Sequence, residues 1–160
     1  MKLSKNFDLD EFTFSQKAIA LGIDNTPNDI QIKNMRYLCQ AVLQPLRDLI
    51  ERPITILSGY RCLTLNAAVH GDDGSHHLCS GNYAAADFVP NGESIEEVKR
   101  ILLGSDFPFE QLIIYDGSDG QGERLHVSAR RPDREILVAK QAKNGKTYYE
   151  LVDNLRRKGK

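Results

Sequence analysis

The sequence predicts an α+β fold with a mainly antiparallel central sheet, N-terminal helices packed on it, and a C-terminal hairpin. The patterns follow the order helix, helix, strand, helix, strand, helix, strand, strand, hairpin. With 160 residues, 41% of them apolar, the chain matches the size of one ordinary domain. We expect a single domain over residues 1–160, with a helical part at 1–50, a site-bearing core at 51–130, and a hairpin with a basic tail at 131–160.

The first fifty residues carry helix signals. Asp8 and Glu11 have the spacing of a capping box, and Gly22 can end the helical segment that follows. Pro45 should bend or interrupt the next helix, which we expect over residues 30–50. Its apolar residues recur every three or four positions and form one stripe, namely Met35, Leu38, Cys39, Val42, Leu46 and Leu49.

The remaining chain alternates strands with short helices. Runs of β-branched and apolar residues predict strands at 54–58, 84–89, 111–115, 124–129, 135–140 and 146–151. Asn144 and Gly145 lie between the last two strands and are a strong signal for a two-residue hairpin turn. Ser94 and Glu97 have capping-box spacing, so we expect a helix that begins there and ends at Gly104.

Composition excludes several functional classes. The 21 lysines and arginines nearly balance the 22 aspartates and glutamates, so no overall charge favours nucleic acid or an anionic membrane. No apolar run approaches the roughly 20 residues that cross a bilayer, and the N-terminus lacks the apolar core of a signal peptide. We therefore expect a monomer that is cytoplasmic as synthesised and binds neither membrane nor nucleic acid.

Nearly all plausible chemistry lies in three segments. These are SGYR at 58–61, SHHLCSGNYAAAD at 75–87, and ERLH at 123–126. A histidine, an aspartate and a second histidine from separate segments would give zinc three protein ligands and leave a fourth position for water. Asp87 lies within an apolar strand, where a carboxylate is costly to bury unless it is paired, protonated or bound to metal. A salt bridge to an arginine is the alternative explanation for it.

The predicted last strand of the core presents a histidine away from the apolar side. His126 alternates with Arg124 and Ser128 on one face, and Leu125 and Val127 occupy the other. A histidine on the polar face of a buried strand is suited to hold a metal. A structural histidine held by a hydrogen bond would show the same pattern.

Two further side chains could take part in hydrolysis. If His126 binds a metal, Glu123 at the strand entrance could reach the open metal position. There it would take a proton from the bound water and later deliver one to the leaving amine. Arg61 follows a strand and a glycine, so its guanidinium could hold a carboxylate or stabilise the oxyanion of a tetrahedral intermediate. An exposed loop arginine is the alternative for Arg61.

As a set, these motifs resemble the zinc D-alanyl-D-alanine carboxypeptidase and dipeptidase family, particularly its small phage and prophage members, which include endolysins. The motifs that carry the resemblance are SGYR at 58–61, S-x-H at 75–77, the approach to the aspartate at 84–87, and the acid three residues before the final histidine at 123–126. The resemblance extends over about residues 4–130. It implies hydrolysis of peptide bonds in peptidoglycan stem peptides.

The resemblance also implies roles for individual residues. Zinc would be held by His77, Asp87 and His126. Glu123 would be the catalytic base, and Arg61 would bind the substrate or stabilise the transition state.

The stretch around the first histidine departs from the family pattern. His77 and Asp87 enclose nine residues, whereas the family usually has six. His76 lies beside His77, so either histidine could be the ligand, although His77 matches S-x-H. Ser75 is implied to support the site and contact the substrate.

The three cysteines, Cys39, Cys62 and Cys79, cannot all pair, so we expect reduced thiols. Cys39 lies on the apolar helix stripe and should be a core residue. Cys79 lies between two expected ligands and could be an inert thiol, a zinc ligand, or a partner of Cys62 when oxidised.

The leading hypothesis is a zinc peptidase that acts on cell-wall peptides. The alternatives are a non-catalytic relative that binds peptidoglycan or serves as a phage structural module, and an α+β interaction domain in which the histidines are structural. A peptidoglycan substrate lies outside the cytoplasm, so release through a phage-type holin, delivery in a virion, or an internal role would each reconcile the substrate with the expected location.

Overall fold

The computed structural model describes residues 1–129, 135–141, 145 and 147–154. Its strands form a six-stranded sheet in the order β1-β2-β4-β3-β5-β6. Neighbouring strands are antiparallel except β3 and β5, which are parallel, so the predicted α+β fold with a mainly antiparallel sheet is confirmed. The strands are β1 (Ile54–Ser58), β2 (Ala84–Pro90), β3 (Phe109–Gly117), β4 (Gly122–Ala129), β5 (Glu135–Gln141) and β6 (Thr147–Asn154).

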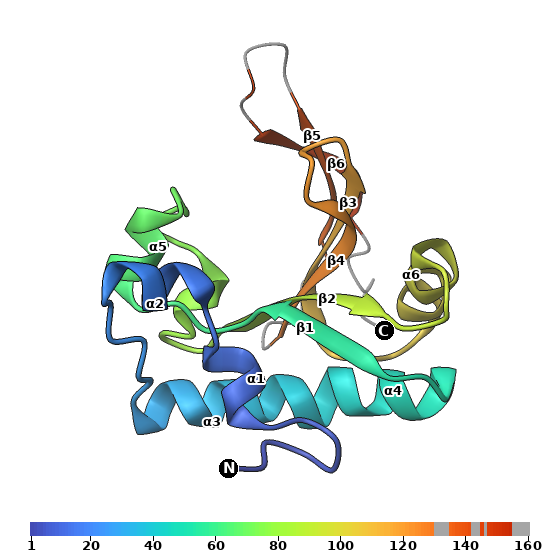
Figure 1. Ribbon diagram of the computed structural model, residues 1–160. Helices are drawn as coiled ribbons and strands as arrows, with labels where there is room; N and C mark the ends of the chain where they lie inside the picture. Colours follow the sequence, from blue (N-terminus) through green and yellow to red (C-terminus); the bar gives the residue numbers. More distant parts are fainter. Residues whose placement is uncertain (130–134, 142–144, 146, 155–160) are drawn as a thin grey trace.

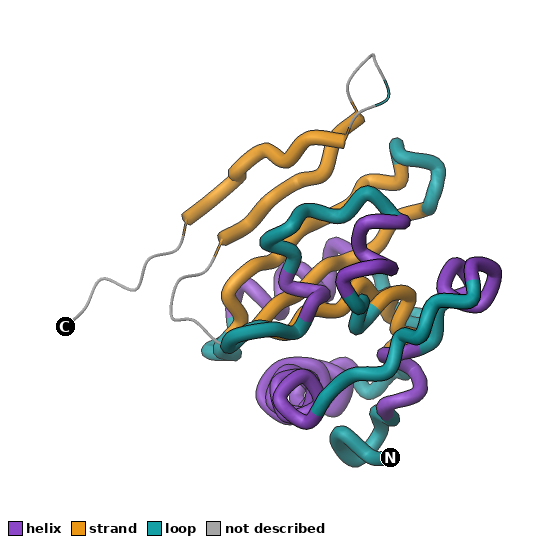
Figure 2. Tube along the Cα trace, turned by 90° about the vertical axis from the view of Figure 1, so that its left-hand side faces the viewer, coloured by secondary structure: helices purple, strands orange, loops and turns teal. Residues whose placement is uncertain are grey.

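The C-terminal pair β5 and β6 continues the sheet beyond β3 (Figure 2). The two strands are antiparallel, as a hairpin requires. Part of the connection between them, including Asn144, lies outside the described residues, so the two-residue turn stays a prediction. The basic tail at 155–160 also lies outside them.

Most helices precede β2 and β4, the strands that carry the site, in the sequence, and in space they lie beside and beneath these strands (Figure 1). Two short ones follow the capping signals: α1 begins with the predicted Asp8 and Glu11 box, and α2 ends at Gly22 in a left-handed conformation. The helical elements are α1 (Leu9–Thr13), α2 (Gln16–Leu21), α3 (Asp29–Leu38), η1 (Cys39–Leu43), α4 (Gln44–Ile50), α5 (Leu63–Ala68), η2 (His76–Leu78) and α6 (Ile95–Gly104).

The predicted interruption near Pro45 takes the form of a π-helical turn. The elements α3, η1 and α4 form one continuous helical rod beneath the sheet (Figure 1). Proline lacks an N–H, and its ring clashes with the carbonyl four residues earlier in a regular α-helix. The wider turn at η1, where the Gln44 N–H bonds to the Cys39 carbonyl, lets the rod continue past the proline.

One apolar layer fills the space between this rod, α6 and one face of the sheet. Cys39, Val98, Phe88, Leu125 and Val127 are fully buried members of this layer. Cys39 is therefore the core residue that the sequence predicted. In the described part of the chain, no helix is long and apolar enough to cross a membrane.

The start of α6 differs in one detail from its predicted capping box. The Ser94 hydroxyl accepts a hydrogen bond from the Glu97 N–H at 3.1 Å, as expected. The predicted reciprocal bond, from the Ser94 N–H to the Glu97 carboxylate, does not form. The Ser94 N–H donates to Glu93 instead, and the Glu97 carboxylate binds Arg100. A charged partner one turn away competes successfully for the carboxylate at this exposed helix end. The helix ends at Gly104 as predicted.

Candidate metal centre

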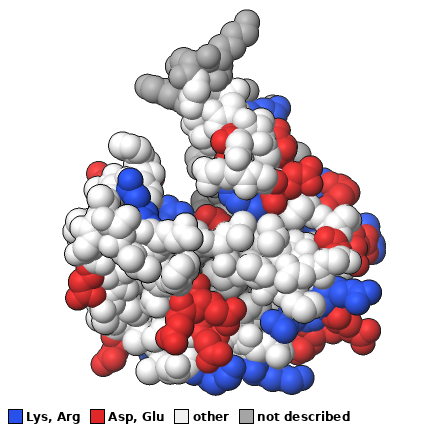
Figure 3. Space-filling model, in the orientation of Figure 1, with Lys and Arg blue, Asp and Glu red and all other residues white. Residues whose placement is uncertain are grey.

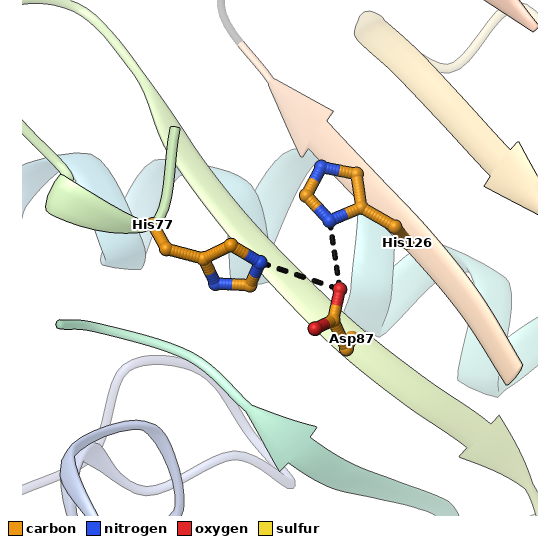
Figure 4. Close-up of side chains that lie close together, drawn as sticks. All are labelled: His77, Asp87 and His126. Carbon is orange, nitrogen blue, oxygen red and sulfur yellow. Dashed lines mark hydrogen bonds and ion pairs between the residues drawn. The ribbon is translucent and has the colours of Figure 1, made fainter. Parts of the chain in front are cut away.

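The sheet itself brings two of the expected ligands together. Asp87 on β2 and His126 on β4 are direct cross-strand partners, so their side chains leave the same face of the sheet. The Nδ1 of His126 lies 2.7 Å from the Oδ1 of Asp87 (Figure 4). Leu125 and Val127 point into the apolar core on the other face, as the alternation predicted.

A short turn carries His77 to the same carboxylate. Its Nε2 lies 3.3 Å from the Oδ1 of Asp87. Its backbone carbonyl accepts the Arg61 N–H at 2.8 Å, and the Ser75 hydroxyl accepts the His77 N–H at 3.3 Å. On the other side of the ring, Nδ1 lies 2.6 Å from the carbonyl oxygen of Gly59. These contacts attach the turn to the segment that follows β1.

The hydrogen bond to Gly59 determines which nitrogen of His77 carries the proton. A carbonyl oxygen only accepts, so Nδ1 must donate, and in the neutral ring Nε2 is left with a lone pair. That lone pair faces the Oδ1 of Asp87, which is also an acceptor. Two acceptors at 3.3 Å repel each other unless a cation lies between them. The separation equals the roughly 3.3 Å between two ligands that each lie about 2.0–2.1 Å from a tetrahedral zinc.

The electrostatics of the three side chains also suit a metal. Burial lowers the pKa of His77, against an opposing effect of Asp87, so the ring is neutral and able to coordinate. Burial alone would raise the pKa of Asp87, but the hydrogen bond from the Nδ1 of His126 helps to hold that pKa well below its usual range. The Nε2 of His126 is buried without a hydrogen-bond partner among the described residues. Ligand atoms from the three residues lie within 4.8 Å of one another, and all three are buried.

Comparison with known proteins agrees with this geometry. The model of one protein family, described as Peptidase M15, matches residues 5–118. The chain belongs to the peptidase M15 family. Because peptidases of this family are metal-dependent, the buried group of His77, Asp87 and His126 is the candidate metal centre of a metallopeptidase. A search of curated proteins found no match to the chain.

The family match ends before β4, which carries the third member of the group. In this M15 peptidase, His126 joins the site through the pairing of β4 with β2. The two adjacent histidines have different partners. His77 points to Asp87, whereas the Nδ1 of His76 contacts the hydroxyl of Ser128 at 2.9 Å.

Arg61 lies beside the metal group, that is, the side chains of His77, Asp87 and His126 that could hold a metal. A register shift in β1 places Ser58 opposite Asp87. The Ser58 hydroxyl accepts from the Nε and Nη2 of Arg61 at 3.2 and 3.0 Å, and Nη2 lies 3.4 Å from the Oδ2 of Asp87. The arginine partner that the sequence offered as the alternative is therefore present on one oxygen of Asp87, while the other oxygen faces the two histidines.

Glu123 lies apart from this group. It opens β4 opposite Asp116 and is exposed. By alternation it shares the face of Leu125, and it is not among the described side chains whose ligand atoms come within 4.8 Å of one another.

Arg124 lies on the same face of β4 as His126, as the alternation predicted, although the sequence suggested no role for it. Arg124 donates to the carboxylate of Asp119 at 3.2 and 2.7 Å, and its guanidinium lies 3.9 Å from the centre of the Tyr115 ring. Its alternation with His126 in the sequence is the signal that could have singled it out. Figure 3 shows the surface hollowed between the part that contains α2 and α5 and the part that contains β3 and β4, with Lys or Arg side chains along the hollow.

Cys79 is not a member of the metal group. It is fully buried in the core, and burial raises the pKa of its thiol to about 12. Cys62 accepts the Leu65 N–H at the start of α5, and all three cysteines are free thiols. A buried thiol with a raised pKa is unreactive at neutral pH, which agrees with the reading of Cys79 as inert.

Proposed function

We propose that this M15 peptidase is a zinc enzyme that hydrolyses peptide bonds in peptidoglycan stem peptides, as a D,D-carboxypeptidase or an endopeptidase. Family membership supports the class of reaction. The observation that carries the metal is the pair of facing acceptors, the Nε2 of His77 and the Oδ1 of Asp87 at 3.3 Å, buried where an imidazolium is disfavoured. Motifs shared with zinc D-alanyl-D-alanine peptidases support the substrate class.

The three buried side chains would hold zinc in the protonation states it needs. The Gly59 carbonyl keeps the proton of His77 on Nδ1, so Nε2 remains free to coordinate. Bound zinc would polarise the scissile carbonyl and lower the pKa of water to about 7. Ser75 supports the site by fixing the turn that carries His77.

Arg61 is proposed to bind the substrate. Its described contacts use Nε and Nη2, which Ser58 and Asp87 hold in place. An arginine has five N–H donors, so the two on Nη1 can reach a terminal carboxylate or the oxyanion that develops during hydrolysis. Holding this guanidinium before the substrate arrives reduces the cost of ordering it.

Glu123 is proposed as the residue that takes a proton from water and delivers it to the leaving amine. Its cross-strand partner Asp116 offers a matched control, because it is also exposed and lies on the same face of the hairpin. We expect Glu123→Gln to lower kcat at least about 100-fold with zinc retained, and Asp116→Asn to change it little. A Glu123→Gln protein that still cleaves at full rate would overturn the assignment.

The metal and the substrate need separate tests. Metal content by mass spectrometry should give one zinc per chain for the wild type and none for His126→Ala. Cleavage is then measured on a synthetic stem peptide ending in D-Ala-D-Ala and on the same peptide ending in L-Ala-L-Ala. Zinc binding without cleavage of either peptide would overturn the proposed substrate while leaving the metal centre intact.

One observation favours a second candidate, a non-catalytic relative that binds peptidoglycan or serves as a phage structural module. The carboxylate expected to act as base is exposed on the face away from His126. If this candidate is correct, the protein should bind purified peptidoglycan sacculi and release no new amine from them. A zinc-dependent rise in free amine would reject it.

A further inference from the structure

We propose that His76 and Ser128 form a positioning pair that fixes the turn carrying His77 against the strand carrying His126. The inference rests on the proposed function, because it assumes that His77 and His126 bind a metal. It assigns a role to His76, which is not a member of the group formed by His77, Asp87 and His126.

The pair forms a second connection between the same two elements. His76 and His77 are consecutive in η2, and His126 and Ser128 are two residues apart on one face of β4. The first connection runs from His77 through Asp87 to His126. The second is the contact of 2.9 Å between the Nδ1 of His76 and the Oγ of Ser128. The contacts of His77 with Gly59 and Arg61 attach η2 to the segment that follows β1, and the His76 contact adds a direct bond to the strand that carries His126.

Ser128 is a rigid anchor for this contact. It is fully buried, and its Oγ also accepts the backbone N–H of Gln111 on β3 at 3.2 Å. A hydroxyl can accept one hydrogen bond while sharing another with an imidazole nitrogen. Removing the hydroxyl therefore leaves both the Nδ1 of His76 and the Gln111 N–H without this partner.

The opposite side of His76 is held by the lengthened loop. The ring stacks on Tyr83, with centroids 4.3 Å apart and planes 10° from parallel. The amide of Asn34 on α3 donates to the carbonyls of Cys79 and Gly81, which fixes the loop that leads to Tyr83. Tyr83, in the loop between His77 and Asp87, therefore packs against the side of the His76 ring.

The experiment compares zinc affinity and metal-free stability in the full chain. His76→Phe keeps a ring to stack on Tyr83 and loses the hydrogen bond, whereas His76→Asn places an amide near the position of Nδ1 and loses the stack. Ser128→Ala removes the hydroxyl. We expect His76→Phe and Ser128→Ala each to weaken zinc binding about 10-fold to 100-fold, as loss of supporting contacts around metal ligands does, and His76→Asn to retain most of the affinity.

Further comparisons separate positioning from general stability. The His76→Phe/Ser128→Ala double variant should bind zinc no more weakly than either single variant, because both remove one contact. The melting temperature of His76→Phe in chelator should stay close to that of the wild type, whereas Ser128→Ala should melt somewhat lower because it also leaves the Gln111 N–H without its acceptor. Wild-type affinity in both single variants, or losses that add in the double variant, would overturn the inference alone. A wild type that binds no zinc would overturn the inference and the proposed function together.

Discussion

Gly59 gives the sharpest test of how packing supports the metal centre. A Cβ at this position would lie 2.7 Å from both the Cα and the carbonyl oxygen of Phe12. These are backbone atoms, so they cannot rotate away as a flexible side chain could. The same carbonyl accepts the Tyr60 N–H at 2.8 Å, and the Gly59 carbonyl accepts from Nδ1 of His77. Gly59→Ala should therefore disturb both α1 and a metal ligand.

The expected size follows from these contacts. Overpacking of a tight site costs about 1–3 kcal/mol, and a weakened Tyr60 to Phe12 hydrogen bond adds about 0.5–1.5 kcal/mol. A loss of about 2–4 kcal/mol in the free energy of unfolding corresponds to a fall in Tm of about 5–15 °C for a chain of this size. Displacing the acceptor of His77 should also weaken zinc binding about 10-fold or more.

The assay is thermal unfolding in chelator, followed by zinc titration of the folded protein. Gly104→Ala is the matched control, because a Cβ there meets nothing within 4 Å and the residue ends a helix. Alanine is the better helix former, so this control should leave Tm unchanged or raise it. The reasoning is refuted if Gly59→Ala melts with or above the wild type and binds zinc equally well.

Two further predictions concern charge. In the metal-free protein, the depressed pKa of His77 means that the unfolded chain binds the extra proton first, so the free energy of unfolding should decrease as pH falls below 6.5. Urea unfolding at pH 7.5 and pH 5 measures this loss. Between the two pH values, the free energy of unfolding should decrease less for His77→Gln than for the wild type, and as much as in the wild type for His70→Gln at an exposed site. Asp119→Asn removes the partner of Arg124; both side chains are 10% exposed, so the cost should lie between those of exposed and buried pairs, about 1–2 kcal/mol. Glu96→Gln at an exposed pair on α6 should cost less than 0.5 kcal/mol, about the limit for such pairs, and equal effects of the two substitutions would contradict this reasoning.

Local patterns in the sequence predicted the elements and the direction of key side chains. Alternation around His126 showed that it points away from the core, and the apolar run around Asp87 marked a buried carboxylate. Neither pattern could show that the two residues are direct neighbours, because register between β2 and β4 is set by pairing across 39 residues of chain. The resemblance supplied that connection before the structure did.

The placement of Glu123 shows a limit of motif spacing. A separation of three residues puts two side chains on the same side of a helix but on opposite faces of a strand. Since His126 lies on a strand, the alternation that pointed it away from Leu125 also pointed Glu123 toward the side of Leu125. The ion pair between Arg124 and Asp119 could not be predicted from alternation, because Asp119 lies in the hairpin turn, where side-chain contacts depend on turn geometry.

The long spacing between His77 and Asp87 is accommodated without separating the two side chains. The entropic cost of closing a loop grows only slowly with its length, so three additional residues cost little if both ends are held. His77 is held by Gly59 and Arg61, and Asp87 is held by its place in β2. The loop between them turns inward, where Cys79 adopts a left-handed conformation and is buried. Spacing between ligands along the chain is therefore a weak predictor of their separation in space, and the attachments at the two ends determine whether the metal group forms.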